Sequence, residues 1–105
     1  MISKKQIEAL SGTITKKFRV KKILLFGSYA FGKPQPESDL DLCLITDLGN
    51  RRKIDFIREI RREILEKFQF PIDIILYDNT EFDQRSSLKN TLEYQIAKHG
   101  ILLNG

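Results

Sequence analysis

Cysteine, tryptophan and histidine are scarce in this chain of 105 residues, which has one cysteine, no tryptophan and one histidine. A single cysteine, Cys43, excludes an internal disulfide and a zinc site built from cysteines. Cys43 lies in an apolar run, so we interpret it as a small buried side chain rather than a nucleophile paired with His99.

Long apolar stretches are also absent. No segment could span a bilayer, and no signal peptide precedes the first helix, so we expect no membrane association and a cytoplasmic protein. The length predicts a single domain over residues 1–105. Hydrophobic residues make up 41% and charged residues 30%, which favours one folded core over disorder.

The net charge of +4 is mildly basic and suits ligands that carry phosphate. The basic residues are interleaved with acidic ones, and the one dense cluster, residues 51–53, is interpreted as a solvated helix start. No basic, aromatic-rich surface for tracking a strand is evident, so nucleic acid is not expected as a direct substrate. The oligomeric state stays open, a homo-oligomer included.

Apolar periodicity predicts three helices. Ser3 and Gln6 resemble a capping box at the start of a helix over residues 3–17. A second helix, about residues 50–68, carries an apolar stripe at positions 54, 57, 60, 64, 65 and 68. A last helix is expected to be capped by Ser86 or Ser87 and to end with Gly100 at its C′ position.

Three short apolar runs predict strands at residues 22–26, 39–46 and 72–77. Residues 28–38 contain Gly32, Pro34 and Pro36, and predict a short helical turn followed by a loop. Residues 101–103 are expected to form an edge strand or a packed tail. This order predicts an α/β (α+β) fold in which helices pack on a small mixed sheet.

Three carboxylates interrupt the predicted strands. Asp39 and Asp41 open one strand and face the same side of it, with Cα atoms about 7 Å apart. Asp73 joins them if its strand pairs alongside. Clustered carboxylates repel each other, and a divalent cation such as Mg²⁺ relieves that repulsion while sharing its site with phosphates. Two such ions can stabilise the attacking and leaving oxygens of a phosphoryl displacement.

A phosphate-binding element is predicted at Gly27-Ser28, directly after a buried strand. Glycine allows a ligand to approach the backbone, and Ser28 offers a hydroxyl and an N–H group to an anion. Simpler interpretations exist for each motif: an ordinary turn at Gly27-Ser28, an Asx turn or cap at Ser38-Asp39, and a charge at Asp73 that protects an edge strand. A shared site explains all of them together.

These residues resemble a known family. Gly27-Ser28-Tyr29-Ala30-Phe31-Gly32, followed by Ser38-Asp39-Leu40-Asp41-Leu42, is similar to the signature of the DNA polymerase beta–type nucleotidyltransferase superfamily, in particular its minimal members of the MntA type. The resemblance covers nearly the whole chain, and Asp73 falls where the family keeps a third carboxylate.

The resemblance implies a palm-like mixed sheet and transfer of a nucleotide from a nucleoside triphosphate to a hydroxyl. It implies catalytic and metal-binding roles for Asp39, Asp41 and Asp73, two Mg²⁺ ions, and contacts to ATP from Gly27, Ser28 and Ser38. It also implies a partner, a HEPN toxin that the chain adenylylates on tyrosine as its antitoxin.

One position departs from the family, which usually has Arg where this chain has Phe31. Arg suits phosphate or partner contacts, and Phe does not replace its charge. Two alternatives therefore stay open: transfer to a hydroxyl of a small molecule, and a catalytically weak antitoxin that acts by binding its partner. The lack of a separate substrate domain speaks against the first, and the retained aspartates speak against the second.

Overall fold

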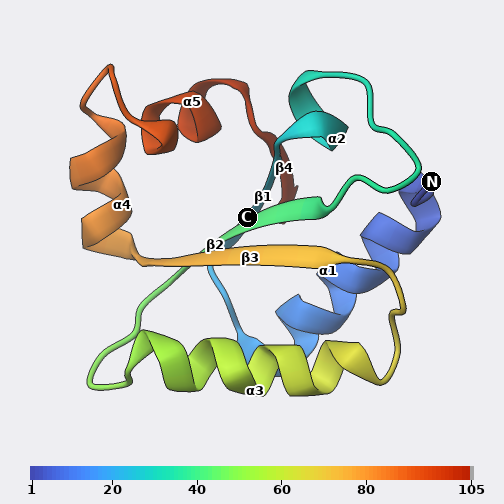
Figure 1. Cartoon of the computed structure of the whole chain (residues 1–105). Coiled ribbons are helices and arrows are strands. Elements are labelled where there is room, and N and C mark those ends of the chain that lie inside the picture. Colours follow the sequence, from blue (N-terminus) through green and yellow to red (C-terminus); the bar gives the residue numbers. More distant parts are fainter. Residues whose placement is uncertain (105) are drawn as a thin grey trace.

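A four-stranded mixed sheet forms the centre of the protein in the computed structural model, which describes residues 1–104. Its strands are β1 (Lys22–Phe26), β2 (Leu40–Thr46), β3 (Ile72–Asp78) and β4 (Ile101–Asn104), in the order β3-β2-β1-β4. β2 runs antiparallel to β1 and parallel to β3, while β4 runs antiparallel to β1. The predicted α/β fold with a mixed sheet is confirmed (Figure 1).

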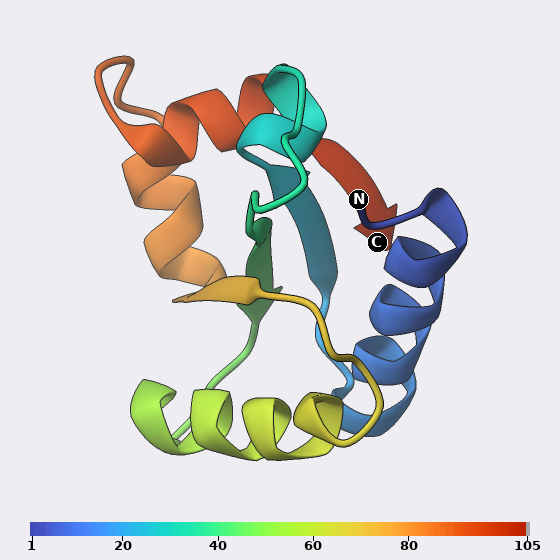
Figure 2. The same ribbon diagram turned by 45° about the vertical axis from the view of Figure 1, so that its right-hand side comes forward.

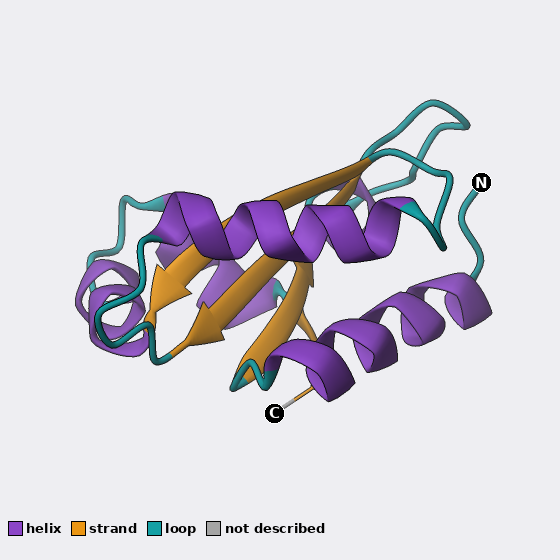
Figure 3. Ribbon diagram, turned by 90° about the horizontal axis from the view of Figure 1, so that it is seen from below, coloured by secondary structure: helices purple, strands orange, loops and turns teal. Residues whose placement is uncertain are grey.

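Five helices cover the two faces of this sheet. α1 (Lys4–Phe18) and α3 (Lys53–Leu65) pack on one face, which is the face that Figure 3 shows from below. α2 (Ser28–Phe31), α4 (Asn79–Ser86) and α5 (Leu92–His99) lie on the opposite side in Figure 1. The sheet is therefore the middle layer of three.

Helix α1 begins as its sequence predicts. The Ser3 hydroxyl accepts a hydrogen bond from the Gln6 N–H at 3.1 Å, and the Gln6 side chain accepts one from the Ser3 N–H at 2.7 Å. This capping box satisfies two N–H groups that have no partner within the helix. The helix ends at Arg19, which adopts a left-handed conformation with φ of 52°.

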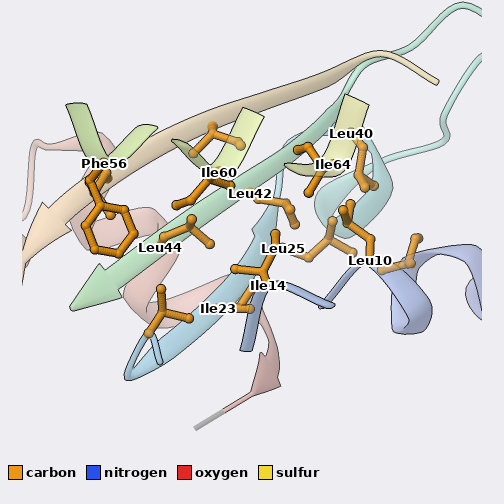
Figure 4. Packing of buried hydrophobic residues seen from close by; sticks show 14 of the residues in the cluster. Leu10, Ile14, Ile23, Leu25, Leu40, Leu42, Leu44, Phe56, Ile60 and Ile64 are labelled. Atoms are coloured by element: carbon orange, nitrogen blue, oxygen red, sulfur yellow. The ribbon is translucent and has the colours of Figure 1, made fainter. Parts of the chain in front are cut away.

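The larger core lies between the sheet and helices α1 and α3 (Figure 4). Three residues of α3, Phe56, Ile60 and Ile64, pack against alternate residues of β2, and α1 contributes Leu10 and Ile14. Burying each such side chain contributes about 1.5–3 kcal/mol. Because strand side chains alternate between faces, this packing directs the remaining residues of β2, Asp41 and Cys43 among them, to the other face.

The predicted apolar stripe of α3 is wrong at two of its positions. Ile54 and Leu65 are exposed, and Phe56, which the stripe left out, is buried. The helix is also shorter than the predicted span of residues 50–68, since it begins after Arg52 and ends at Leu65. Phe68 lies beyond the helix and still packs against the core from the following turn.

The predicted last helix begins later than expected, and α4, a helix that the sequence did not predict, precedes it. Ser86 ends α4 and Ser87 is its C-cap, so neither residue caps α5. The cap of α5 is Thr91, whose hydroxyl accepts from the Tyr94 N–H at 3.1 Å. Helix α4 buries only Phe82, and one buried side chain leaves no apolar periodicity for sequence reasoning to detect.

Gly100 serves a different purpose from the predicted left-handed C′ residue. It is the C-cap of α5 and is extended, with φ of −65° and ψ of 154°. A Cβ at this position would lie 2.5 Å from the Ile96 carbonyl oxygen and 3.2 Å from that of Leu25. A glycine is therefore required by the close approach of the chain to β1 as it enters the edge strand β4. None of the helices formed by residues 1–104 has the length and apolar character needed to cross a membrane.

Candidate active site

Two of the predicted carboxylates are brought side by side by the parallel pairing of β2 with β3. Asp41 and Asp73 are partners in the ladder between these strands. Both face the side of the sheet on which Cys43 and Ile75 pack with α4 and α5. Asp73 was expected to join the other aspartates only if its strand lay next to theirs, and β3 does lie next to β2.

Burial and like charge act together on Asp41. Its pKa is raised, first by burial and then by the charges of Asp73 and Asp39. Asp39 lies two residues earlier, just before β2, and is exposed. The carboxylates of Asp73 and Asp39 are thus close enough to repel the charge on Asp41. A bound cation would relieve this repulsion.

The absence of a side chain at Gly27 makes room for the carboxylate of Asp41. Residue 27 follows β1 directly, and Phe26 is the antiparallel partner of Asp41. A Cβ built on Gly27 would overlap Oδ2 of Asp41 and lie 2.9 Å from its Cγ. The backbone of residue 27, with φ of 73° and ψ of −154°, lies in a region that only glycine adopts readily. The lack of a side chain here allows Asp41 to approach the end of β1.

Ser28 begins the single turn of α2 that follows. The Gly27 carbonyl accepts hydrogen bonds from the N–H groups of Ala30 and Phe31 at 3.0 and 2.8 Å, which closes this turn. In a helix the first N–H groups have no intrahelical acceptor. The hydroxyl and N–H of Ser28 therefore lie just beyond the end of β1, the strand whose last residue pairs with Asp41.

Ser38 is engaged within its own loop. Its hydroxyl accepts from the Gln35 N–H at 2.8 Å, and its N–H donates to the Gln35 carbonyl at 3.0 Å. These bonds shape the turn that leads the chain to Asp39 and into β2. The hydroxyl keeps a free lone pair and proton, so a nucleotide contact by Ser38 stays a prediction.

Arg61 of α3 reaches the start of β3 and was missed by sequence reasoning. It donates to the Ile72 carbonyl at 3.2 Å, and its guanidinium lies 4.0 Å from Oδ1 of Asp73. The Asp73 side chain is 60% exposed. A cation from the protein thus lies beside one of the three carboxylates, and no local pattern in the sequence signals this pair.

A second polar cluster supports α5. Glu93 is buried, and the Tyr77 hydroxyl of β3 donates to its carboxylate at 2.8 Å. The Arg85 guanidinium lies 3.9 Å from the same carboxylate. Burial and then the Glu93 carboxylate raise the pKa of Tyr77, so the phenol stays protonated and keeps donating. This cluster fixes α5 over the sheet face that carries Asp41.

The donor set fits magnesium with phosphate as a co-ligand. Among residues 1–104, no group of three or more His, Cys, Asp or Glu side chains is arranged to hold a metal ion by itself. Mg²⁺ usually needs only one or two carboxylates, because water and substrate phosphates complete its shell. Asp41, whose carboxylate lies against the backbone of Gly27, and the nearby Asp39 match that requirement.

Comparisons with known proteins identify what this chain is similar to. The family model described as "Polymerase beta, Nucleotidyltransferase" matches residues 8–104. A protein of Methanocaldococcus jannaschii named "Putative protein adenylyltransferase MJ0604" is 31% identical over 98 residues, which cover 89% of this chain and 94% of that protein. The matched residues include all of the aspartates and the Gly27-Ser28 pair.

Proposed function

Because this chain belongs to the polymerase beta nucleotidyltransferase family, we propose that it transfers AMP from ATP to a tyrosine hydroxyl of a partner HEPN toxin. The family makes the chain a nucleotidyltransferase enzyme. The nucleotide, the acceptor, the metal and the antitoxin role are the proposal. The observation that carries it is the position of Asp41, between Gly27 at the end of β1 and Asp73 on β3.

In this proposal Asp39, Asp41 and Asp73 hold two Mg²⁺ ions, which stabilise negative charge on the phosphate oxygens. Ser28 donates its N–H and hydroxyl to the triphosphate, and Gly27 lets the phosphates approach the backbone. Ser38 contacts the nucleotide from the loop before β2. The acceptor oxygen attacks the α-phosphorus, the bond to the β-phosphate breaks, and pyrophosphate leaves.

Asp73 is the candidate base for the acceptor. Its exposed carboxylate can be reached by a hydroxyl from outside the protein and can accept the proton that this hydroxyl loses. General-base help of this kind contributes typically 10²- to 10⁴-fold to a rate. The more enclosed Asp41 is harder for an incoming hydroxyl to reach than the exposed Asp73.

A protein acceptor is favoured by two observations. The relative from Methanocaldococcus jannaschii carries the name of a protein adenylyltransferase. In addition, residues 1–104 form one sheet with its covering helices and no second lobe that could enclose a small acceptor. A flat acceptor surface on another protein fits such a site, and the resemblance to minimal nucleotidyltransferases supplies the HEPN toxin as that protein, in the cytoplasm.

The test is transfer of label from α-labelled ATP to the cognate HEPN protein in the presence of Mg²⁺. Wild-type protein should label the toxin on tyrosine and abolish its toxicity, and chelation should stop the labelling. Asp39→Ala/Asp41→Ala should lose the labelling, whereas Asp83→Ala, which removes an exposed carboxylate on α4, should keep it. Labelling by a folded Asp39→Ala/Asp41→Ala protein would refute the proposal.

A second candidate is an antitoxin that acts by contact alone. The guanidinium of Arg61 beside Asp73 favours it, because this cation already offsets the charge of one of the three carboxylates. This candidate predicts that Asp39→Ala/Asp41→Ala protein neutralises the toxin as well as the wild type does. Loss of neutralisation together with loss of labelling would decide for the enzyme.

A further inference from the structure

An apolar groove of about 630 Å³ lies between α2 and α5. Ala30 and Phe31 line it from α2, and Leu92, Gln95 and His99 line it from α5. Figure 2 shows the two helices next to each other above the sheet. The opposite side of α5 packs through Ile96 onto the sheet face that carries Asp41, so groove and carboxylates share one face of the protein.

Two large apolar side chains are left open to solvent in this groove. Phe31 is 46% exposed and Leu92 is 50% exposed. A concave, mostly apolar site of this volume with a few polar groups at its rim is typical of sites for small molecules. The polar groups here are the amide of Gln95 and the imidazole of His99.

The groove begins one helical turn away from the Gly27-Ser28 end of the nucleotide site proposed above. Phe31 ends the same single helical turn that Ser28 begins, so the two residues are separated by about 4.5 Å along the helix axis. A ribose spans a comparable length between the α-phosphate and the base of a nucleotide. A triphosphate at Gly27-Ser28 would therefore deliver its base to the groove.

We propose that this groove binds the base of the nucleoside triphosphate, with the Phe31 ring against the face of the base and Leu92 on the α5 side. The inference rests on the proposed function, in which the triphosphate lies at Gly27-Ser28. An aromatic ring binds any base through its face. Phe31 then binds the base at the position where the family usually carries Arg.

Gln95 gives the groove a hydrogen-bonding group for the base. An amide offers a donor and an acceptor side by side, which matches the N6 amino group and N7 of adenine. His99 adds a second polar group at the rim. The preference for adenine over a pyrimidine comes from stacking, because a purine places a larger face against the Phe31 ring.

The rival occupant is the ring of an acceptor tyrosine. A tyrosine must place its hydroxyl at the α-phosphorus, beside Asp41 and Asp73, and its short side chain ends there. The base is the part of the reactants that lies a full ribose away from the reacting phosphorus, as the groove does. We therefore assign the groove to the base and leave the acceptor at the open side of Asp73.

Calorimetric titration of the full chain tests this assignment, with Mg²⁺-ATP, Mg²⁺-CTP and Mg²⁺-tripolyphosphate as ligands. Wild-type protein should bind ATP more tightly than CTP and tripolyphosphate. Phe31→Ala should weaken ATP binding about tenfold, within the range of stacking contributions, and leave tripolyphosphate binding unchanged. Phe31→Tyr should restore the affinity, and Gln95→Leu should weaken ATP binding and leave tripolyphosphate binding unchanged.

Leu65→Ala is the control, because Leu65 is an exposed apolar residue on α3, on the other side of the sheet. It should change none of these affinities. Equal binding of ATP and tripolyphosphate by wild type would overturn the groove assignment and leave the proposed function standing. Binding of neither ligand would overturn both. Unchanged ATP affinity but lost toxin labelling in Phe31→Ala, with circular dichroism showing a folded protein, would assign the groove to the acceptor instead.

Discussion

The carboxylate of Asp41 occupies the space that a side chain on Gly27 would need. A Cβ on Gly27 would overlap Oδ2 of Asp41, and the backbone of Gly27 adopts a positive φ of 73°. A side chain at residue 27 would therefore strain the backbone and displace the most enclosed carboxylate of the site at once.

Gly27→Ala should consequently affect both stability and activity. The strained backbone alone costs of order 1–3 kcal/mol, and the displaced Asp41 should abolish detectable transfer. Urea denaturation and toxin labelling measure the two effects. Gly12→Ala is the control, since a Cβ there meets nothing within 4 Å in the middle of α1. That substitution should raise the stability by about 0.5–1 kcal/mol and leave transfer intact, and equal behaviour of the two variants would contradict the role of Gly27.

Arg61 should compete with metal for Asp73. Its guanidinium lies 4.0 Å from Oδ1 of Asp73 in an exposed pair, and exposed pairs are worth about 0.2–1 kcal/mol. Arg61→Gln should therefore lower the Mg²⁺ concentration for half-maximal transfer by roughly 1.4- to 5-fold. Arg58→Gln, one turn earlier on α3 and paired with Asp55, is the control. No change in the Mg²⁺ requirement of Arg61→Gln would argue against Asp73 as a ligand.

The buried pair of Tyr77 and Glu93 should stabilise the placement of α5. Tyr77→Phe removes the hydrogen bond of 2.8 Å to a buried carboxylate, which should cost about 1.5–3 kcal/mol in the free energy of unfolding. In a double-mutant cycle with Glu93→Gln, the two effects should be less than additive, because each substitution removes the same bond. Strict additivity would show that the pair does not interact.

Cys43 should be inert in the folded protein. Burial, followed by the charge of Glu93, raises the pKa of its thiol to about 12 from 9.0. Alkylation by iodoacetamide at pH 8 should therefore proceed only through unfolding, and its rate should rise with urea as the unfolded population does. Rapid alkylation without denaturant would contradict the burial of Cys43.

The same shift has a defined sign in the stability. The folded state holds the thiol proton more tightly than the unfolded state, so the stabilisation is complete below pH 9.0 and is lost as the pH rises toward 12. Cys43→Ala should remove this loss, which for one group amounts to at most about 1.4 kcal/mol per pH unit. Parallel urea titrations of wild type and variant between pH 8 and 10 measure the difference.

The sequence was informative wherever the physical cause is local. Strand β1 has the predicted bounds, and the capping box at Ser3 forms as predicted. The alternation of Asp41 with the buried Leu40 and Leu42 predicted which face of β2 carries this carboxylate, because strand geometry fixes side-chain direction within two residues. Asp73 was included because it interrupts a predicted strand, on the condition that this strand pairs alongside.

Local patterns failed where one contact or one turn decides the structure. Helix α4 rests on the single buried residue Phe82, so no helix was predicted for its residues. Thr91, rather than Ser86 or Ser87, caps α5. Which of these three hydroxyl residues caps the helix depends on where the chain turns, and the apolar pattern does not predict that turn.

Pairs that form through space were not predictable from one sequence. Arg61 and Asp73 are brought together by the packing of α3 under β3, and Tyr77 meets Glu93 only once α5 has folded back over the sheet. The groove at Phe31 is likewise created by two helices from distant parts of the chain. The sequence showed that Phe31 is unusual for the family, but it could not predict which residues of α5 lie beside it.

The parallel pairing of β2 with β3 also bears on how the protein folds. Parallel strands cannot join by a hairpin, so Asp41 and Asp73 meet only after the connection through α3 has closed. Long-range pairings of this kind form more slowly than local helices, and this one brings two like charges together as it forms. A ligand that neutralises both would hold the last-formed part of the sheet in place, so the lifetime of the folded sheet should lengthen as nucleotide and metal become available.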